Sequence, residues 1–213
     1  MKPIRKSITV DSRSNHMNKM NRPLWRKSKS FLFLIISVLF FYIYPAGAET
    51  FNNTVVFGDS LSDAGNLSQA IGIGVSRFTT NPGETAVMYV ADGLDLPATA
   101  SSSGGNNYAW GGAGVLNNYQ LGLIFSPTIQ SQVNNYLKNN KVSASTLYQM
   151  WGGANDIFSI YESAPGTATA RIIPVANTEV SLLNDLYHAG GKYVVVYNLP
   201  NLGETPDAKN RNL

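Results

Sequence analysis

A serine follows directly after a short apolar strand in this chain. Residues 54–57 read Thr-Val-Val-Phe, and Gly58, Asp59 and Ser60 then turn the chain out of that β-branched run. A hydroxyl just past the carboxyl end of a buried strand lies at the edge where open α/β sheets bind ligands. The pattern indicates Ser60 as a nucleophile, although the same residues are typical of an ordinary strand-to-loop turn. We interpret Asp59 and Asp63 as hydrogen-bond acceptors that shape this loop, not as catalytic acids.

Two further segments follow Ser60 along the chain. They read Asn-Tyr-Ala-Trp-Gly-Gly-Ala at 107–113 and Gly-Ala-Asn-Asp at 153–156. Together with Gly-Asp-Ser-Leu-Ser-Asp at 58–63, they resemble three of the four motif blocks of the GDSL hydrolases, the SGNH superfamily of serine esterases and lipases, in the family's order. The resemblance spans about residues 54–206 and looks closest to bacterial autotransporter-type and secreted esterases. It implies a GDSL-type carboxylic ester hydrolase with Ser60 as its nucleophile.

Attack on an ester places negative charge on the carbonyl oxygen, which hydrogen-bond donors must stabilise. Each such donor typically contributes about 3–4 kcal/mol. The resemblance implies an oxyanion hole made by the backbone N–H groups of Ser60 and Gly111 and the side-chain amide of Asn155. Glycine at 111 leaves its N–H uncovered. Taken alone, Gly111 and Gly112 are also compatible with a simple turn, and Asn155 with Asp156 is compatible with a helix cap.

The family also requires a general base, a histidine with an aspartate three residues before it. Only two histidines occur, and His16 lies upstream of an apparent targeting segment. His188 has Asp185 at the required spacing, but apolar residues recur at helical intervals over residues 169–189 and a Gly-Gly pair follows. His188 is therefore expected to end a helix at the amino-terminal edge of the sheet, roughly 17–20 Å from Ser60. We interpret its match to the pattern as a decoy.

The last segment of the chain supports this interpretation. Residues 192–203 predict a buried strand followed by a Leu-Pro-x-Leu-Gly exit loop, and only a polar tail follows from Glu204. In the family this loop comes well before the catalytic histidine. We therefore expect a hydrolase domain that is C-terminally truncated before the Asp-x-x-His block.

The first 48 residues have the composition of a secretory signal peptide. They hold nine of the 16 basic residues, then a 14-residue apolar run at 31–44, then small residues up to Ala48. Spanning a bilayer takes roughly 20 apolar residues, so we expect cleavage after Ala48, with a retained membrane anchor as the alternative. This predicts export to the periplasm, the outer membrane surface or the medium.

Residues 49–213 differ in charge from this leader. They contain seven Lys or Arg against twelve Asp or Glu, a net charge of about −5, which argues against a nucleic-acid partner. The absence of cysteine excludes disulfides, thiolate metal sites and a cysteine nucleophile, and a single histidine in this part disfavours a zinc hydrolase. We expect no metal or organic cofactor, and an ester or lipid substrate as partner. Membrane contact is expected only transiently during export, or through an autotransporter barrel that this sequence does not contain.

Strand-like and helix-like segments alternate along residues 49–213. Strands are predicted at 54–57, 146–151 and 193–198, with one helix from about 126 to 137 and a long helix reaching 189. This order is typical of an α/β fold with a parallel sheet, which gathers Ser60, Gly111 and Asn155 at one carboxyl edge. The resemblance implies a three-layer, flavodoxin-like SGNH hydrolase fold with its C-terminal part missing.

The sequence leaves several functions open. The first hypothesis is an esterase or lipase that uses Ser60 and needs no cofactor. The alternatives are a catalytically inactive truncated remnant, a surface ligand-binding or carbohydrate-binding module that reuses the fold, and a polysaccharide deacetylase.

Overall fold

The computed structural model describes residues 50–79, 83–118, 126–163 and 165–211. The chain divides into two units, residues 1–48 and residues 49–213, and the described residues all belong to the second unit. The division falls after Ala48, where the sequence predicts signal-peptide cleavage; the cleavage itself stays a prediction.

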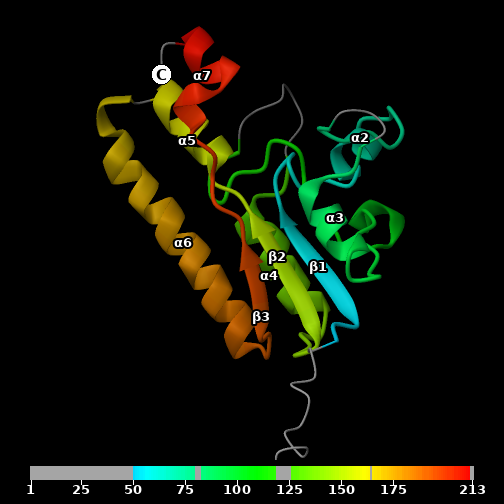
Figure 1. The fold of residues 1–213 in the computed structure, drawn as a ribbon. Helices are drawn as coiled ribbons and strands as arrows, with labels where there is room; N and C mark the ends of the chain where they lie inside the picture. Colours follow the sequence, from blue (N-terminus) through cyan, green and yellow to red (C-terminus); the bar gives the residue numbers. More distant parts are fainter. Residues whose placement is uncertain (1–49, 80–82, 119–125, 164, 212–213) are drawn as a thin grey trace, which may run out of the picture. The chain divides into compact units, whose positions relative to one another are not determined.

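A parallel three-stranded sheet forms the centre of the described unit (Figure 1). Its strands are β1 (Asn53–Gly58), β2 (Thr146–Trp151) and β3 (Tyr193–Val196), in the order β1-β2-β3. Gly58 pairs with Trp151 and Met150 pairs with Val196, so all three strands end at the same edge. The three predicted strands are confirmed by their β-branched and aromatic runs, although β3 ends at Val196 instead of residue 198. The predicted burial is wrong for β3, where Val195 and Val196 are 37% and 43% exposed, because β3 is the outer strand of the described sheet.

Three helices pack on one face of the sheet: α4 (Ile129–Asn139), α5 (Ala154–Ser163) and α6 (Ala168–His188). Their apolar side chains bury Phe57, Tyr148 and Met150 in the main core. On the other face, α3 (Ala86–Asp92) packs on β1 through a smaller apolar cluster. The fold is therefore a three-layer α/β architecture, as expected.

None of the helices in the described unit has the length and apolar character to cross a membrane. Shorter elements complete this unit. These elements are α2 (Asn66–Ala70), α7 (Pro206–Arg211) and the single 3₁₀ turns Ser101–Ser103, Pro165–Thr167 and Leu202–Glu204.

Two helix predictions need correction. α4 begins at Ile129, because the hydroxyl of Thr128 accepts a 3.1 Å hydrogen bond from the Ser131 N–H and caps the helix there. Pro127 thus precedes the helix instead of occupying its first turn. The helix predicted over residues 169–189 is confirmed as α6, but residues 154–163, expected as a loop, form the additional helix α5, which a 3₁₀ turn separates from α6.

Candidate active site

Ser60 lies in the turn that leaves β1 at the carboxyl edge of the sheet. The Asp59 N–H donates to the Trp151 carbonyl at 3.3 Å, and the Ser62 N–H closes the turn on the Asp59 carbonyl at 3.1 Å. The Ser60 side chain is partly exposed, and its hydroxyl has no hydrogen-bond partner among the described residues. It is therefore accessible to a ligand.

The segment at 107–113 runs alongside β1 and ends beside this turn. Asn107 forms an isolated parallel bridge with Val56, the Tyr108 N–H donates to the Val56 carbonyl at 2.8 Å, and the Trp110 N–H donates to the Gly58 carbonyl at 3.0 Å. These bonds carry the Gly111-Gly112 pair to the same edge as Ser60, as the sequence predicts.

The backbone N–H of Gly111 is hydrogen-bonded within the protein, whereas the sequence analysis expected it to be free for a carbonyl oxygen. It donates to the Asp63 carboxylate at 2.9 Å, in a buried site, so in this structure it is not available to a carbonyl oxygen. The next residue, Gly112, has a φ of 78°, in the region that favours glycine, and its N–H has no acceptor among the described residues. Such an unmatched N–H is uncommon in a buried segment, and it makes Gly112 the better-placed donor.

Asn155 lies in the first turn of α5, directly after β2. Its side-chain amide donates to the Ala113 carbonyl at 2.8 Å, which ties the start of α5 to the 107–113 segment. The amide carries a second hydrogen, which no described residue accepts. The structure thus brings Asn155 and the glycine pair together at the edge that holds Ser60.

Asp156 fixes the backbone of residues 115–117, a role that the sequence analysis missed. Its buried carboxylate accepts hydrogen bonds from the backbone N–H groups of Val115, Leu116 and Asn117. The sequence pattern suggested a helix cap instead. Nothing in the local sequence reveals these partners, which are about 40 positions away.

Gln132 was also missed as a part of the site. Its side-chain amide bonds both to the N–H and to the carbonyl of Gly58, each at 2.9 Å, and so fixes the end of β1 just before the turn that carries Ser60. The residue is buried on α4. A buried glutamine in an otherwise amphipathic helix is the one signal that could have indicated such a role.

Asp59 and Asp63 act as loop-shaping acceptors, as predicted. One oxygen of Asp59 accepts the Leu61 N–H at 2.9 Å, and Asp63 accepts N–H groups at the start of α2. Burial raises the pKa of Asp59 to about 7, against the opposing effect of the Leu61 hydrogen bond, and the negative charge of Asp156 raises it further.

Residues 54–213 match the family described as GDSL-like Lipase/Acylhydrolase. The chain belongs to this family. It is 32% identical to Lipase 1 of Photorhabdus luminescens over 166 residues, which cover 76% of this chain and 24% of that protein. It is 30% identical to a GDSL esterase/lipase of Arabidopsis thaliana over 220 residues, covering 81% of this chain and 59% of that one. The chain thus spans between about a quarter and three fifths of the length of these curated relatives.

His188, which matches the Asp-x-x-His spacing, is not near Ser60. His188 is the last residue of α6, and β3 begins shortly afterwards at Tyr193, which pairs with Leu147 near the start of β2. His188 therefore lies at the opposite, amino-terminal edge of the sheet (Figure 1), as predicted. The described residues also contain no group of three or more acidic or histidine side chains that could hold a metal.

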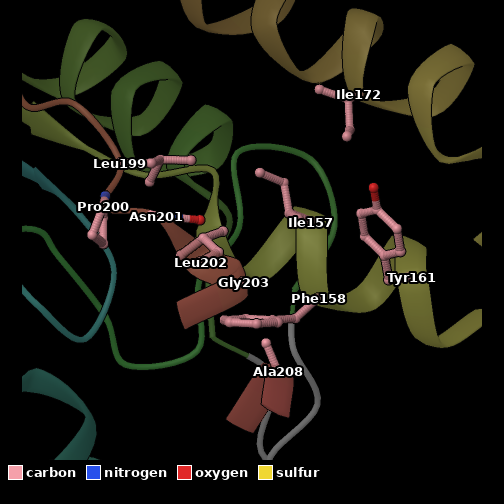
Figure 2. Close-up of a pocket in the computed structure, with 10 residues that line it drawn as sticks. All are labelled: Ile157, Phe158, Tyr161, Ile172, Leu199, Pro200, Asn201, Leu202, Gly203 and Ala208. Carbon is pink, nitrogen blue, oxygen red and sulfur yellow. The ribbon is translucent and has the colours of Figure 1, made fainter. Parts of the chain in front are cut away.

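An apolar pocket of about 380 Å³ opens between α5, α6 and the loop that leaves β3 (Figure 2). In the figure, Ile157 and Tyr161 of α5 and Ile172 of α6 lie across from Leu199 and Leu202 of the exit loop. None of the predicted site residues lines this pocket.

Proposed function

We propose that this GDSL family member hydrolyses carboxylic esters with Ser60 as its nucleophile. The main observation that supports this proposal is that three separate segments of the chain meet at one edge of the sheet. The Trp110 N–H reaches Gly58, the Asp59 N–H reaches Trp151, and the Asn155 amide reaches Ala113. The family membership and the names of its relatives, lipase and esterase, support the same reaction.

In the proposed reaction, the Ser60 hydroxyl oxygen attacks the ester carbonyl carbon and gives its proton to a general base. The N–H groups of Ser60 and Gly112 and the free amide hydrogen of Asn155 stabilise the negative carbonyl oxygen, with Gly112 taking the place predicted for Gly111. The intermediate then expels the alcohol, which takes up the proton from the base. Water hydrolyses the acyl-enzyme by the reverse sequence of proton transfers. No cofactor is needed.

This reaction requires a general base, and no described residue bonds to the Ser60 hydroxyl in this structure. We propose that a histidine of the family pattern supplies it. The same observation favours one alternative, a chain that binds ligands at this edge without turning them over, as in the truncated remnant considered from the sequence.

Hydrolysis of p-nitrophenyl butyrate by the full chain tests the proposal. Ser60→Ala should abolish the enzymatic rate, and Ser181→Ala, which changes an exposed serine of α6, should leave it unchanged. Added imidazole tests whether the reaction is limited by the lack of a base, because imidazole can accept the Ser60 proton; it should raise the wild-type rate above that of Ser60→Ala in the same buffer. Equal rates for wild type and Ser60→Ala with and without imidazole would reject the esterase and favour the ligand-binding alternative.

We also propose that the protein is exported as a secreted or surface-displayed enzyme, with residues 1–48 as a cleavable signal peptide. The apolar run at 31–44 between a basic stretch and small residues supports this. Amino-terminal sequencing of the protein from cell fractions tests it. We expect mature protein beginning at Glu49 outside the cytoplasm, and an uncleaved cytoplasmic chain would contradict the proposal.

A further inference from the structure

An unusual concentration of exposed apolar side chains lies in residues 71–78, which follow α2 and are called here the apolar loop. Ile71, Ile73, Val75 and Phe78 are 41%, 65%, 63% and 55% exposed. Single exposed apolar residues are ordinary on protein surfaces, whereas a contiguous group marks a contact site for a partner, a ligand or a membrane.

The apolar loop is held in this conformation by its own backbone. Gly72 and Gly74 have φ values of 76° and 77°, which give the loop two turns that other residues rarely adopt. The Ile73 N–H donates to the Ser68 carbonyl at 3.0 Å, and the Ser76 N–H donates to the Ser68 hydroxyl at 2.8 Å. The exposed side chains are therefore presented by an ordered loop.

The apolar loop borders the candidate active site. A Cβ atom built on Gly111 would lie 2.5 Å from Leu67 Cδ2 and 3.0 Å from Phe78 Cε2, so these two side chains pack closely on Gly111. The same two residues, with Ile71 and Ile73, line a pocket of about 200 Å³. Whatever the apolar loop contacts is brought close to the edge that holds Ser60.

The charge of this segment indicates the kind of partner. Residues 64–79 contain no acidic residue, and Arg77 is their one charged side chain, within a unit of net charge about −5. Arg77 lines the small pocket together with the buried Asp63, and its Nη1 donates to the Gly83 carbonyl at 3.4 Å. The Arg77 side chain is partly exposed, and its guanidinium has further N–H donors. Apolar side chains beside a partly exposed guanidinium match acyl chains beside phosphate oxygens.

We propose that the apolar loop docks on a glycerophospholipid surface, with Ile73 and Val75 entering the acyl region and Arg77 binding phosphate oxygens. The purpose of this contact rests on the proposed function, since it would bring Ser60 to esters held in lipid. It is a third kind of membrane contact, distinct from passage during export and from an anchoring barrel. The docking itself does not depend on catalysis.

Because the chain contains no cysteine, a single introduced cysteine can carry a polarity-sensitive nitrobenzoxadiazole label. We would label Ile73→Cys and Val75→Cys in the full chain carrying Ser60→Ala. The matched controls are Ile173→Cys and Val180→Cys on α6, whose native side chains are 55% and 57% exposed. Vesicles of phosphatidylcholine with phosphatidylglycerol serve as the probe. Each label reports only its own surroundings. Vesicle binding through the apolar run at 31–44 would therefore not by itself make the emission at positions 73 and 75 differ from that at 173 and 180.

We expect vesicles to shift the label emission to the blue at positions 73 and 75 and to leave it unchanged at 173 and 180. Arg77→Gln should raise the lipid concentration for the half-maximal response about fivefold. An equal response at all four positions, or no response at 73 and 75, would overturn the proposal; the latter result would point to a protein partner instead. Because Ser60→Ala removes hydrolysis, failure of the esterase proposal leaves this result unaffected.

Discussion

The carboxylate of Asp63 accepts a 2.9 Å hydrogen bond from the backbone N–H of Gly111, 48 positions later in the chain. The same side chain accepts the N–H groups of Gly65, Asn66 and Leu67 at 2.8, 2.6 and 3.1 Å. One buried carboxylate thus joins the loop that carries Ser60, the start of α2 and the glycine pair. It also occupies the Gly111 N–H and leaves that of Gly112 for a ligand.

This relationship predicts that Asp63→Ala strongly destabilises the protein. The substitution leaves four backbone N–H groups without their acceptor in a buried site, and each unmatched donor costs about 1–3 kcal/mol. Since water can enter part of the space, we expect a loss of about 3–5 kcal/mol in the free energy of unfolding, measured by urea denaturation. Asp92→Ala, at an exposed position of α3, should change it by no more than about 0.5 kcal/mol. Equal stability of the two variants would contradict this role for Asp63.

A second prediction concerns the loop that Asp156 holds. A Cβ atom at Gly114 would lie 2.0 Å from the Asn117 carbonyl oxygen and 2.7 Å from Asp156 Oδ2. The first contact is with backbone, which cannot rotate away, so Gly114→Ala should lower the free energy of unfolding by about 2–4 kcal/mol. Gly166→Ala is the matched control, because a Cβ there meets nothing within 4 Å. Thermal unfolding of both variants checks this, and unchanged stability of Gly114→Ala would show that the loop is not so closely packed.

The strands and the position of Ser60 were predictable because their signals are local. A β-branched run followed by Gly-Asp-Ser indicates both the strand and its exposed turn, whatever lies elsewhere in the chain. The final residue of α6 was predictable for the same reason, since helical periodicity ends at a Gly-Gly pair. That placement correctly excluded His188 from the site.

The details of the proposed oxyanion hole were not predictable in the same way. Which of Gly111 and Gly112 has a free N–H depends on where the Asp63 carboxylate points, and this follows from packing between distant segments. The bonds of Asp156 and Gln132 are likewise long-range. The Thr128 cap explains the late start of α4, since a capping hydroxyl and Pro127 offer competing boundaries two residues apart.

A third prediction follows from the raised pKa of Asp59. Its folded-state pKa is about 7 against an ordinary 3.8, so the folded protein binds the proton more tightly than the unfolded chain. The contribution of Asp59 to the free energy of unfolding is therefore fully present below pH 4. It is lost as the pH rises towards and through 7, by up to about 1.4 kcal/mol per pH unit. Asp59→Asn keeps an oxygen for the Leu61 N–H and removes the ionisation. We expect the variant to be more stable than wild type at pH 8, with a smaller difference at pH 5.

Urea denaturation at several pH values checks the prediction for Asp59. Asp92→Asn, at an exposed site, is the control and should follow the wild-type pH profile. A profile for Asp59→Asn that runs parallel to wild type between pH 4 and 8 would show that Asp59 ionises normally in the folded protein.

A fourth prediction separates transition-state stabilisation from substrate binding at Asn155. If its second amide hydrogen bonds the negative carbonyl oxygen only as charge develops, Asn155→Ala should lower kcat about 10²–10³-fold and leave KM nearly unchanged. The substitution also removes the 2.8 Å bond to the Ala113 carbonyl, which should cost about 1 kcal/mol of stability. Kinetics with p-nitrophenyl butyrate, imidazole included where it raises the rate, together with a thermal unfolding curve, distinguish the two effects. A fall in kcat of less than about threefold in a folded variant would remove Asn155 from the oxyanion hole, whereas a rise in KM alone would assign it to substrate binding.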